Sequence, residues 1–340
     1  MERLQRRLLQ AVATGRRHVA SDPSNPLAMG VSRAAFAAAL PVLAMGAMRD
    51  NQPVPSAKLQ AATANAREHY ERNGWWIAPD LLSVDAIHRA NTGAKKHLAG
   101  ERDAQLPAQV QPLLQDVTSD DPTELQVFTH IALLNWDIRA LLADSRLGAM
   151  ASQLSGHAAL RLFSSALVYK PPRETGATRI GWHADMAYFK TCSCQQMVTA
   201  WVPLQDTDAR MGGPVLLSRS HRIQRPRDSE HARRSFLNGD AEATLDVLGD
   251  DTVSPSLRRG DVLFLHAGLM HTSGPNRREL PRWAAVFFLQ SGDNHYRVAH
   301  EDDGSLATHL NDRLCRRRPD GLPDYADPRY CPAVWPREGS

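Results

Sequence analysis

The spacing of hydrophobic and polar residues changes character after Gly156. Upstream of that glycine, the first segment is rich in helix formers, the second begins with a typical capping residue, and the third has Leu, Ile and Met at helical spacing. The pattern predicts three helical segments, over residues 57–73, 83–98 and 133–156. The first is expected to end at Gly74, and Ser83 is suited to cap the second. A short strand at residues 75–79 and a loop at residues 101–126 lie between them.

Downstream of Gly156 the chain consists of short apolar runs rich in β-branched and aromatic residues, separated by turn sequences. Five of these runs are predicted as strands, at residues 160–170, 197–205, 213–221, 261–271 and 283–290. Helices followed by many short strands favour an α+β arrangement with a β-sandwich or barrel core.

Composition places the chain among ordinary globular proteins and excludes several specialised classes. Of 340 residues, 42% are hydrophobic and 23% are charged, and a net charge of +3 does not imply nucleic-acid binding. Arginine-rich runs near Arg233 and Cys315 are expected to be solvated. Four cysteines are too few for a disulfide scaffold, and Cys192 and Cys194 lack the further ligands of a zinc site.

Residues 1–55 are interpreted as an N-terminal extension, because breaker clusters enclose an apolar stretch that begins at Ser32. The stretch has the outline of a secretory signal, but Pro41 interrupts it and it is shorter than the ~20 residues that span a bilayer. We therefore expect a cytoplasmic protein without a membrane partner, with export as the alternative. The main domain is assigned to residues 56–300, and residues 301–340 to a C-terminal tail.

The stretch GWHADMAYF, residues 181–189, places a histidine and an aspartate two positions apart. In an extended chain His183 and Asp185 project to the same face, where they can supply two ligands to a metal ion. Such pairs also occur by chance, so a third ligand is needed. His271, at the end of the predicted strand 261–271, offers it. Two histidines and one carboxylate on one octahedral face are typical of non-haem Fe(II) oxygenases.

The ordered set of motifs resembles the phytanoyl-CoA dioxygenase family of Fe(II)/2-oxoglutarate-dependent oxygenases over about residues 66–292. The matching stretches are YERNGWWIAPDLLS, LRLFSSALVYKPP, GWHADMAYF, VTAWVPLQDTD, MGGPVLLSRSH, GDVLFLHAGLMHTSGPN and RELPRWAAVFFLQ. One departure is that Ser218 and Arg219 stand where the family usually has Pro-Gly, which puts the geometry of that turn in doubt. The resemblance implies a double-stranded β-helix (a jelly roll, cupin-like) flanked by N-terminal helices.

The resemblance also implies roles for single residues. His183, Asp185 and His271 would bind iron. Arg282 would bind the distal carboxylate of 2-oxoglutarate, since its planar guanidinium accepts a carboxylate in bidentate fashion. Ser273 would lie near the same carboxylate, and Trp201 would line the cosubstrate pocket.

Two further sets of residues are candidates for binding. A polar residue of the strand 160–170 is expected to help hold the cosubstrate, with four alternatives: Ser164, Ser165, Tyr169 and Lys170. The substrate pocket is expected to involve Tyr188 and Phe189, which follow the metal motif, and Tyr169.

The expected activity is hydroxylation of an unactivated C–H bond with O2 and 2-oxoglutarate, releasing succinate and CO2, with ascorbate as the in vitro reductant. Desaturation, epoxidation and cyclisation use the same ligands and stay open. Halogenation is disfavoured because Asp185 fills the position that halogenases of this fold leave to chloride. A non-catalytic jelly-roll binding protein is the alternative from another class.

The expected partner is a small molecule, of secondary-metabolite, acyl or amino-acid type, either free or linked to a carrier or CoA. No nucleic-acid partner is expected. The sequence leaves open whether the protein is a monomer or a homodimer.

Overall fold

The structure is a computed structural model that describes residues 56–114, 116, 118, 123–172, 180–194, 196–222, 252–301 and 303–336. The expected N-terminal extension lies outside the described residues, as does most of the arginine-rich segment 221–236. No described helix is both long enough and apolar enough to cross a membrane.

The first two predicted helices are confirmed. Helix α3 (Ser56–Asn73) stops before Gly74, whose φ of +82° favours glycine, and leads into strand β1 (Trp75–Ala78). Helix α4 (Val84–Leu98) begins after Ser83, whose side chain accepts a hydrogen bond from the backbone N–H of Ala86.

The predicted helical segment 133–156 is divided into several pieces. They are α5 (Ile131–Leu134), α6 (Trp136–Arg139), the 3₁₀ turn η3 (Ala140–Ala143) and α7 (Ser145–Ser155). The side chain of Asn135 accepts a hydrogen bond from the backbone of Ile138, and that of Asp144 from the backbone of Arg146. Each side chain caps a new helix, so the chain turns twice within a sequence that has continuous helical spacing.

The region predicted as the loop 101–126 contains the 3₁₀ turn η2 (Gln111–Leu113) and leads into a strand that the sequence interpretation missed. This strand, β2 (Gln126–Thr129), pairs with β3.

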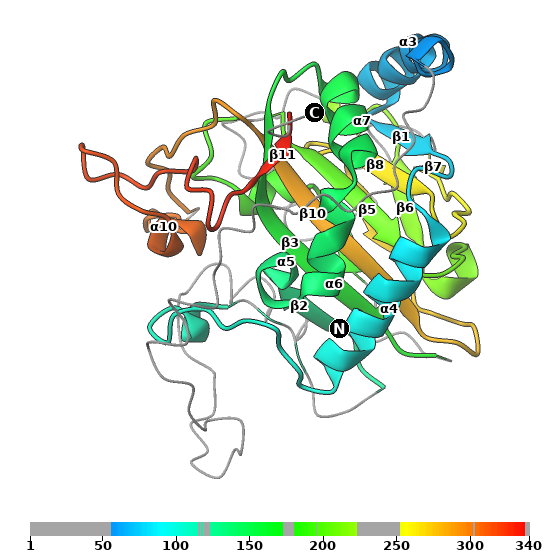
Figure 1. Cartoon of the computed structure of the whole chain (residues 1–340), viewed down its shortest axis with the longest axis horizontal. Coiled ribbons are helices and arrows are strands. Elements are labelled where there is room, and N and C mark those ends of the chain that lie inside the picture. Colours follow the sequence, from blue (N-terminus) through cyan, green and yellow to red (C-terminus); the bar gives the residue numbers. More distant parts are fainter. Residues whose placement is uncertain are drawn as a thin grey trace.

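Two antiparallel sheets form the core (Figure 1). The larger sheet has the order β1-β8-β5-β10-β3-β11, with β2 also paired to β3. Its remaining strands are β3 (Leu160–Lys170), β5 (Val198–Pro203), β8 (Val262–His266), β10 (Arg282–Ser291) and β11 (Ala333–Trp335). The smaller sheet has the order β4-β9-β6-β7, formed by β4 (Ile180–His183), β9 (His271–Ser273), β6 (Pro214–Leu217) and β7 (Thr252–Val253).

The predicted strand 261–271 is wrong as a single strand. Strand β8 ends at His266, and the backbone N–H of Leu269 bonds back to the carbonyl of His266 in a turn. The chain then crosses to the other sheet, where His271 begins β9. His271 therefore lies at the start of a strand, and it pairs with His183 of β4.

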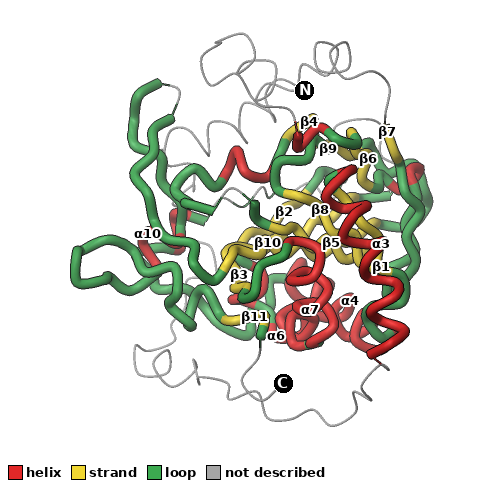
Figure 2. The backbone as a smooth tube through the Cα atoms, turned by 90° about the horizontal axis from the view of Figure 1, so that it is seen from above, coloured by secondary structure: helices red, strands yellow, loops and turns green. Residues whose placement is uncertain are grey.

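The two faces of the larger sheet have different neighbours. Figure 2 shows α4 and α7 on one side of this sheet and strands β4, β6 and β9 on the other. Helix residues such as Ile87 and Leu147 pack with Phe264 and Phe287 in one apolar cluster. On the opposite face, Trp201 belongs to a second apolar cluster, which includes side chains from strands of the smaller sheet. This is the expected jelly roll with helices on one side, and the fold class is confirmed.

Arg219 occupies the turn in which the sequence departs from the family pattern. Its φ of +69° is a left-handed conformation that favours glycine. Neighbouring side chains hold the turn, since Ser218 accepts a hydrogen bond from the Trp75 indole and Ser220 from the backbone of Met270. The turn thus keeps a glycine-type backbone without a glycine.

The segment assigned to a C-terminal tail packs against the jelly roll in the structure. Strand β11 pairs with β3, and the side chain of Asn311, in α10 (Asn311–Leu314), donates a hydrogen bond to the carbonyl of Phe163. Tyr325 is 1% exposed. These contacts join residues 303–336 to the folded unit, so a domain boundary at residue 300 does not follow the packing.

Candidate active site

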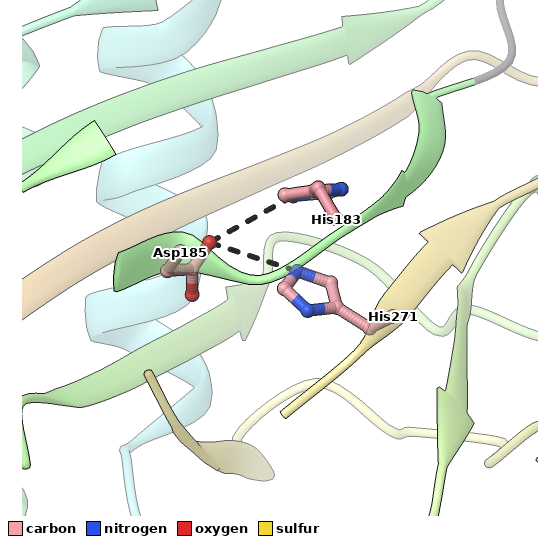
Figure 3. A group of neighbouring side chains, drawn as sticks. All are labelled: His183, Asp185 and His271. Atoms are coloured by element: carbon pink, nitrogen blue, oxygen red, sulfur yellow. Dashed lines mark ion pairs between the residues drawn. The ribbon is translucent and has the colours of Figure 1, made fainter. Parts of the chain in front are cut away.

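Three sequence-predicted side chains converge between the two sheets (Figure 3). His183 ends β4, Ala184 continues the extended backbone with φ −122° and ψ 134°, and Asp185 begins the 3₁₀ turn η4 (Asp185–Tyr188). His271 reaches the same point from β9. One nitrogen or oxygen atom from each residue lies within 4.8 Å of the others, so the group could hold a metal ion.

Backbone carbonyls orient both imidazole rings. Nδ1 of His183 lies 2.8 Å from the carbonyl oxygen of Gly181, and Nδ1 of His271 lies 3.0 Å from that of Leu269. A carbonyl oxygen only accepts, so each Nδ1 carries a proton and each neutral ring has its lone pair on Nε2. Both Nε2 atoms lie 3.7 Å from Oδ1 of Asp185. The three lone-pair atoms thus face one another.

The electrostatic setting of His183 favours a neutral imidazole. Burial and the neighbouring His271 lower the pKa of His183 to about 4. Asp185 is 4% exposed, and its Oδ2 accepts a 2.6 Å hydrogen bond from the hydroxyl of Thr199 on β5. Thr199 therefore fixes one carboxylate oxygen and leaves Oδ1 directed at the histidines.

Arg282, at the start of β10, is buried with an incomplete set of partners. The side chain is 1% exposed, and its Nη2 donates to the carbonyl of Gly212 over 3.2 Å. Its Nε and Nη1 are buried and have no hydrogen-bond partner among the described residues. Burial lowers the pKa of Arg282 to about 9, and the guanidinium lies 5.6 Å from the ring of Trp201. Two unpaired buried donors call for an acceptor such as a carboxylate.

Ser273 lines the same cavity as Arg282 and is held by Lys170, which the sequence interpretation left as one of four alternatives. Nζ of Lys170 donates to the Ser273 hydroxyl over 2.7 Å and to the carbonyl oxygens of Ser273 and Gly274 over 3.1 and 2.5 Å. Lys170 is completely buried and is the register partner of Arg282 across β3 and β10. Because the Ser273 oxygen accepts from Lys170, its own proton is available to a ligand.

A cavity of about 220 Å³ joins these groups. Its lining includes the three converging residues, Arg282, Ser273, Trp201, Tyr188, Phe189, Ser164 and Ser165. The Tyr188 ring lies 5.9 Å from that of His183, and burial is the first cause that raises its pKa to about 12.

Tyr169 lies elsewhere, and we drop it from the substrate pocket. Its ring packs against Trp283, with centroids 4.5 Å apart, within the apolar cluster on the helix-covered face of the larger sheet. Side chains alternate between the two faces of a strand, so Tyr169 points away from the face that carries Val168 and the cavity.

Three residues of the cavity region were missed at the level of the sequence. Thr199 stands two positions before Trp201 and therefore shares its face of β5, a signal that alternation could have given. His130 and His309 also line the cavity, but they come from irregular segments that carry no motif.

Comparisons with known proteins agree with this geometry. The model of the family described as phytanoyl-CoA dioxygenase matches residues 70–284. No curated protein sequence matches the chain.

Several solved structures share the fold. The non-heme alpha ketoglutarate dependent epimerase SnoN from nogalamycin biosynthesis aligns with a TM-score of 0.60 and 21% identity, covering 81% of this chain and 99% of that one. The carbocyclase SnoK from the same biosynthesis aligns with a TM-score of 0.60 and 21% identity, covering 84% and 100%. EctD from S. alaskensis with bound Fe aligns with a TM-score of 0.55 and 22% identity, covering 69% and 78%.

Proposed function

The chain belongs to the phytanoyl-CoA dioxygenase family, and from this premise we propose that it is an Fe(II)- and 2-oxoglutarate-dependent dioxygenase acting on a small molecule. The observation that carries the proposal is the convergence of the Nε2 atoms of His183 and His271 on Oδ1 of Asp185. The cavity next to these atoms is also lined by Arg282, whose buried Nε and Nη1 have no hydrogen-bond partner in the described part of the chain.

The donor set fits the proposed metal. Two neutral imidazoles and one carboxylate are the ligands that non-haem iron enzymes of this kind use, and they leave further coordination positions open. His183, Asp185 and His271 would hold the ion, with Thr199 orienting the carboxylate. Halogenation is not proposed, because Asp185 occupies the position that chloride would need.

The cosubstrate also fits the residues present. The buried Nε and Nη1 of Arg282 require an acceptor, and a carboxylate of 2-oxoglutarate would satisfy them and balance the charge. The Ser273 hydroxyl would donate to the same carboxylate, while Trp201 walls the site beside the guanidinium.

The chain's own contribution is binding, orientation and exclusion of water. A bound iron would activate O2 as the oxidant, and 2-oxoglutarate would supply two of the four electrons and leave as succinate and CO2, while the substrate C–H bond would supply the other two and become C–OH. Tyr188 and Phe189 would keep the apolar part of the substrate against the metal ligands and limit the access of water. Ascorbate is proposed as the reductant in vitro.

Hydroxylation is the proposed outcome, and desaturation, epoxidation or cyclisation are alternatives with the same residues. The epimerase and the carbocyclase of nogalamycin biosynthesis, which share the fold, support keeping these alternatives and support a natural-product substrate. A cytoplasmic location, a monomeric or homodimeric state and the lack of nucleic-acid or membrane partners also remain proposals.

The test is aerobic incubation of the purified chain with Fe(II), ascorbate and 2-oxoglutarate, with succinate as the readout. An oxygenase of this class forms some succinate even without its substrate. We expect succinate from the wild-type protein and none above background from Asp185→Ala. Equal background in both would favour a non-catalytic jelly-roll binding protein.

A further inference from the structure

The cavity has two ends with different chemistry. Arg282 lies at the start of β10, and Phe288, six residues further along the same strand, is the register partner of Ser164 on β3. At a rise of about 3.3 Å per residue, the backbone positions of Arg282 and Phe288 lie roughly 20 Å apart along the strand. A cosubstrate that reaches from the Arg282 side chain to Asp185, which Thr199 of β5 holds, would leave the Ser164 side of the cavity, on β3, to another molecule.

Ser164 lies in the same row of the larger sheet as Thr199, the residue that holds Asp185. Phe288 pairs with Ser164 on one side and with Thr199 on the other, so the three residues form one row across β3, β10 and β5. Thr199 bonds directly to Asp185. Two inter-strand spacings, about 10 Å, separate Ser164 from Thr199, so a small molecule can reach both Ser164 and the metal ligands.

The hydroxyl of Ser164 is available to a ligand. Ser164 lines the cavity and is 7% exposed, and no described residue forms a hydrogen bond with its side chain. Its neighbour Ser165 differs, because the Ser165 hydroxyl accepts from the backbone N–H of Ala132.

His309 supplies a second polar group at this end. Its Nδ1 accepts a hydrogen bond from the backbone N–H of Asn311, so in the neutral ring the proton is on Nε2. Burial and the nearby His130 lower its pKa well below the usual value, which keeps the ring neutral at pH 7. No described residue accepts a hydrogen bond from this Nε2.

A β-bulge builds this end of the cavity. The register of β3 and β10 shifts between Phe288 and Leu289, opposite Phe163 and Ser164. The Phe163 ring stacks on His309 with centroids 4.4 Å apart, and Phe189 holds His309 from a second side at 5.8 Å. Bulges near active sites redirect side chains in this way, and here the ring of His309 is fixed by two aromatic contacts.

The Ser164–His309 end of the cavity has no charged side chain of its own among the described lining residues. Among the described lining residues, Asp185 and Arg282 are the charged ones, and the proposed iron and 2-oxoglutarate use both. The walls near Ser164 are apolar, formed by residues such as Phe189, Phe288 and Leu310. A phosphate, carboxylate or ammonium group buried here would lack a counter-charge, which strongly disfavours binding.

We propose that the Ser164–His309 end of the cavity binds a neutral oxygen function, a hydroxyl or a carbonyl, of a largely apolar substrate. The Ser164 hydroxyl can donate and accept, and Nε2–H of His309 donates. The inference rests on the proposed function and narrows it, because it excludes zwitterionic amino acids and the phosphates of CoA from this part of the cavity. A linked carrier would have to remain outside.

The test compares three bicyclic probes of similar size: naphthalene, 2-naphthol, which is neutral at pH 7, and 2-naphthoate, which is anionic. Their affinities for the full chain are measured by equilibrium dialysis without oxygen, both with Fe(II) and 2-oxoglutarate and without them. The variants are Ser164→Ala and His309→Phe. Ser152→Ala on α7 is the matched control, because its hydroxyl bonds to the carbonyl of His157 outside the cavity.

We expect 2-naphthol to bind more tightly than naphthalene, and 2-naphthoate at least tenfold more weakly than 2-naphthol once 2-oxoglutarate is present. Each cavity variant should weaken 2-naphthol binding about three- to tenfold and leave naphthalene unchanged, since one hydrogen bond is lost. Ser152→Ala should change neither affinity. If His309→Phe does not fold, the change in 2-naphthol binding caused by Ser164→Ala tests the proposal by itself.

Three results would overturn the proposal: no binding of either neutral probe, equal losses for naphthalene and 2-naphthol, or tight 2-naphthoate binding that 2-oxoglutarate does not displace. Binding in the protein without iron separates this inference from the proposed function. If that binding is as expected while no succinate forms, the oxygenase proposal fails and the neutral subsite stands.

Discussion

Thr199 donates a 2.6 Å hydrogen bond to Oδ2 of Asp185, while Oδ1 of the same carboxylate lies 3.7 Å from the Nε2 atoms of both histidines. The two oxygens therefore have separate tasks. One is held by the larger sheet, and the other faces the point at which the three side chains converge.

Replacing this hydroxyl tests its effect on metal binding. Thr199→Val keeps the shape of the side chain but frees the carboxylate to rotate, so Fe(II) affinity should fall about 10- to 100-fold. Anaerobic Fe(II) titration measures it. Thr129→Val is the matched control, because its hydroxyl bonds to Asp116 instead, and it should retain wild-type affinity. Equal affinity in both variants would remove Thr199 from the support of the metal.

Arg282→Ala should raise the KM for 2-oxoglutarate by roughly thirty- to several-thousand-fold, since losing one partner of a desolvated charge pair costs ~2–5 kcal/mol. Lysine should rescue only in part, because it offers a point charge and no planar fork. Arg259→Ala, at an exposed ion pair with Asp206, is the control. Lower thermal stability with an unchanged KM would assign Arg282 a purely structural role.

Lys170 is a positioning residue for Ser273 in this account. Lys170→Met should raise the KM for 2-oxoglutarate about three- to tenfold, with little change in kcat or in Fe(II) affinity. If Lys170 acts through Ser273, the double variant with Ser273→Ala should be less impaired than the sum of the two single changes. Additive losses would contradict that coupling.

The buried imidazole of His97 predicts a pH dependence of folding stability. Burial is the main cause that lowers its pKa to about 3, and the ring packs at 4.9 Å from Phe128. Below about pH 6.5 the unfolded chain binds a proton there that the folded chain does not. The free energy of unfolding should therefore fall with decreasing pH, by up to about 1.4 kcal/mol per pH unit for this group.

His97→Leu should reduce that slope between pH 6.5 and 4, measured by urea unfolding at a series of pH values. His88→Gln, on the exposed face of the same helix, should keep the wild-type slope. Identical slopes in the wild type and His97→Leu would contradict the assignment.

Local sequence signals predicted the parts of the fold that depend on short-range physics. Gly74 ends α3 and Ser83 caps α4 as expected, because helix ends are set by nearby backbone groups. The breaks at Asn135 and Asp144 were not predicted, since a side chain that can cap a helix can equally lie within one. The crossing of the chain between sheets before His271 depends on pairing with β4, which periodicity cannot show.

The same division applies to the candidate site. The sequence could predict the His183–Asp185 pair and Arg282 as site residues, because each lies in or next to a strand that carries a motif. The position of Lys170 opposite Arg282 could not be predicted, because it depends on the pairing of β3 with β10. His309 was out of reach, because it belongs to an irregular segment that only the packing of Phe163 and Phe189 brings to the cavity.

We propose that His183, Asp185 and His271 bind Fe(II) and that 2-oxoglutarate binds beside them. The most direct test of this proposal is anaerobic titration of 2-oxoglutarate into the Fe(II)-loaded chain while the visible metal-to-ligand charge-transfer band is recorded. We predict a band that saturates at one 2-oxoglutarate per chain in the wild type and is absent in His183→Ala and Asp185→Ala. A wild-type protein without the band, or a His183→Ala protein with the full band, would show that these residues do not hold iron and 2-oxoglutarate together.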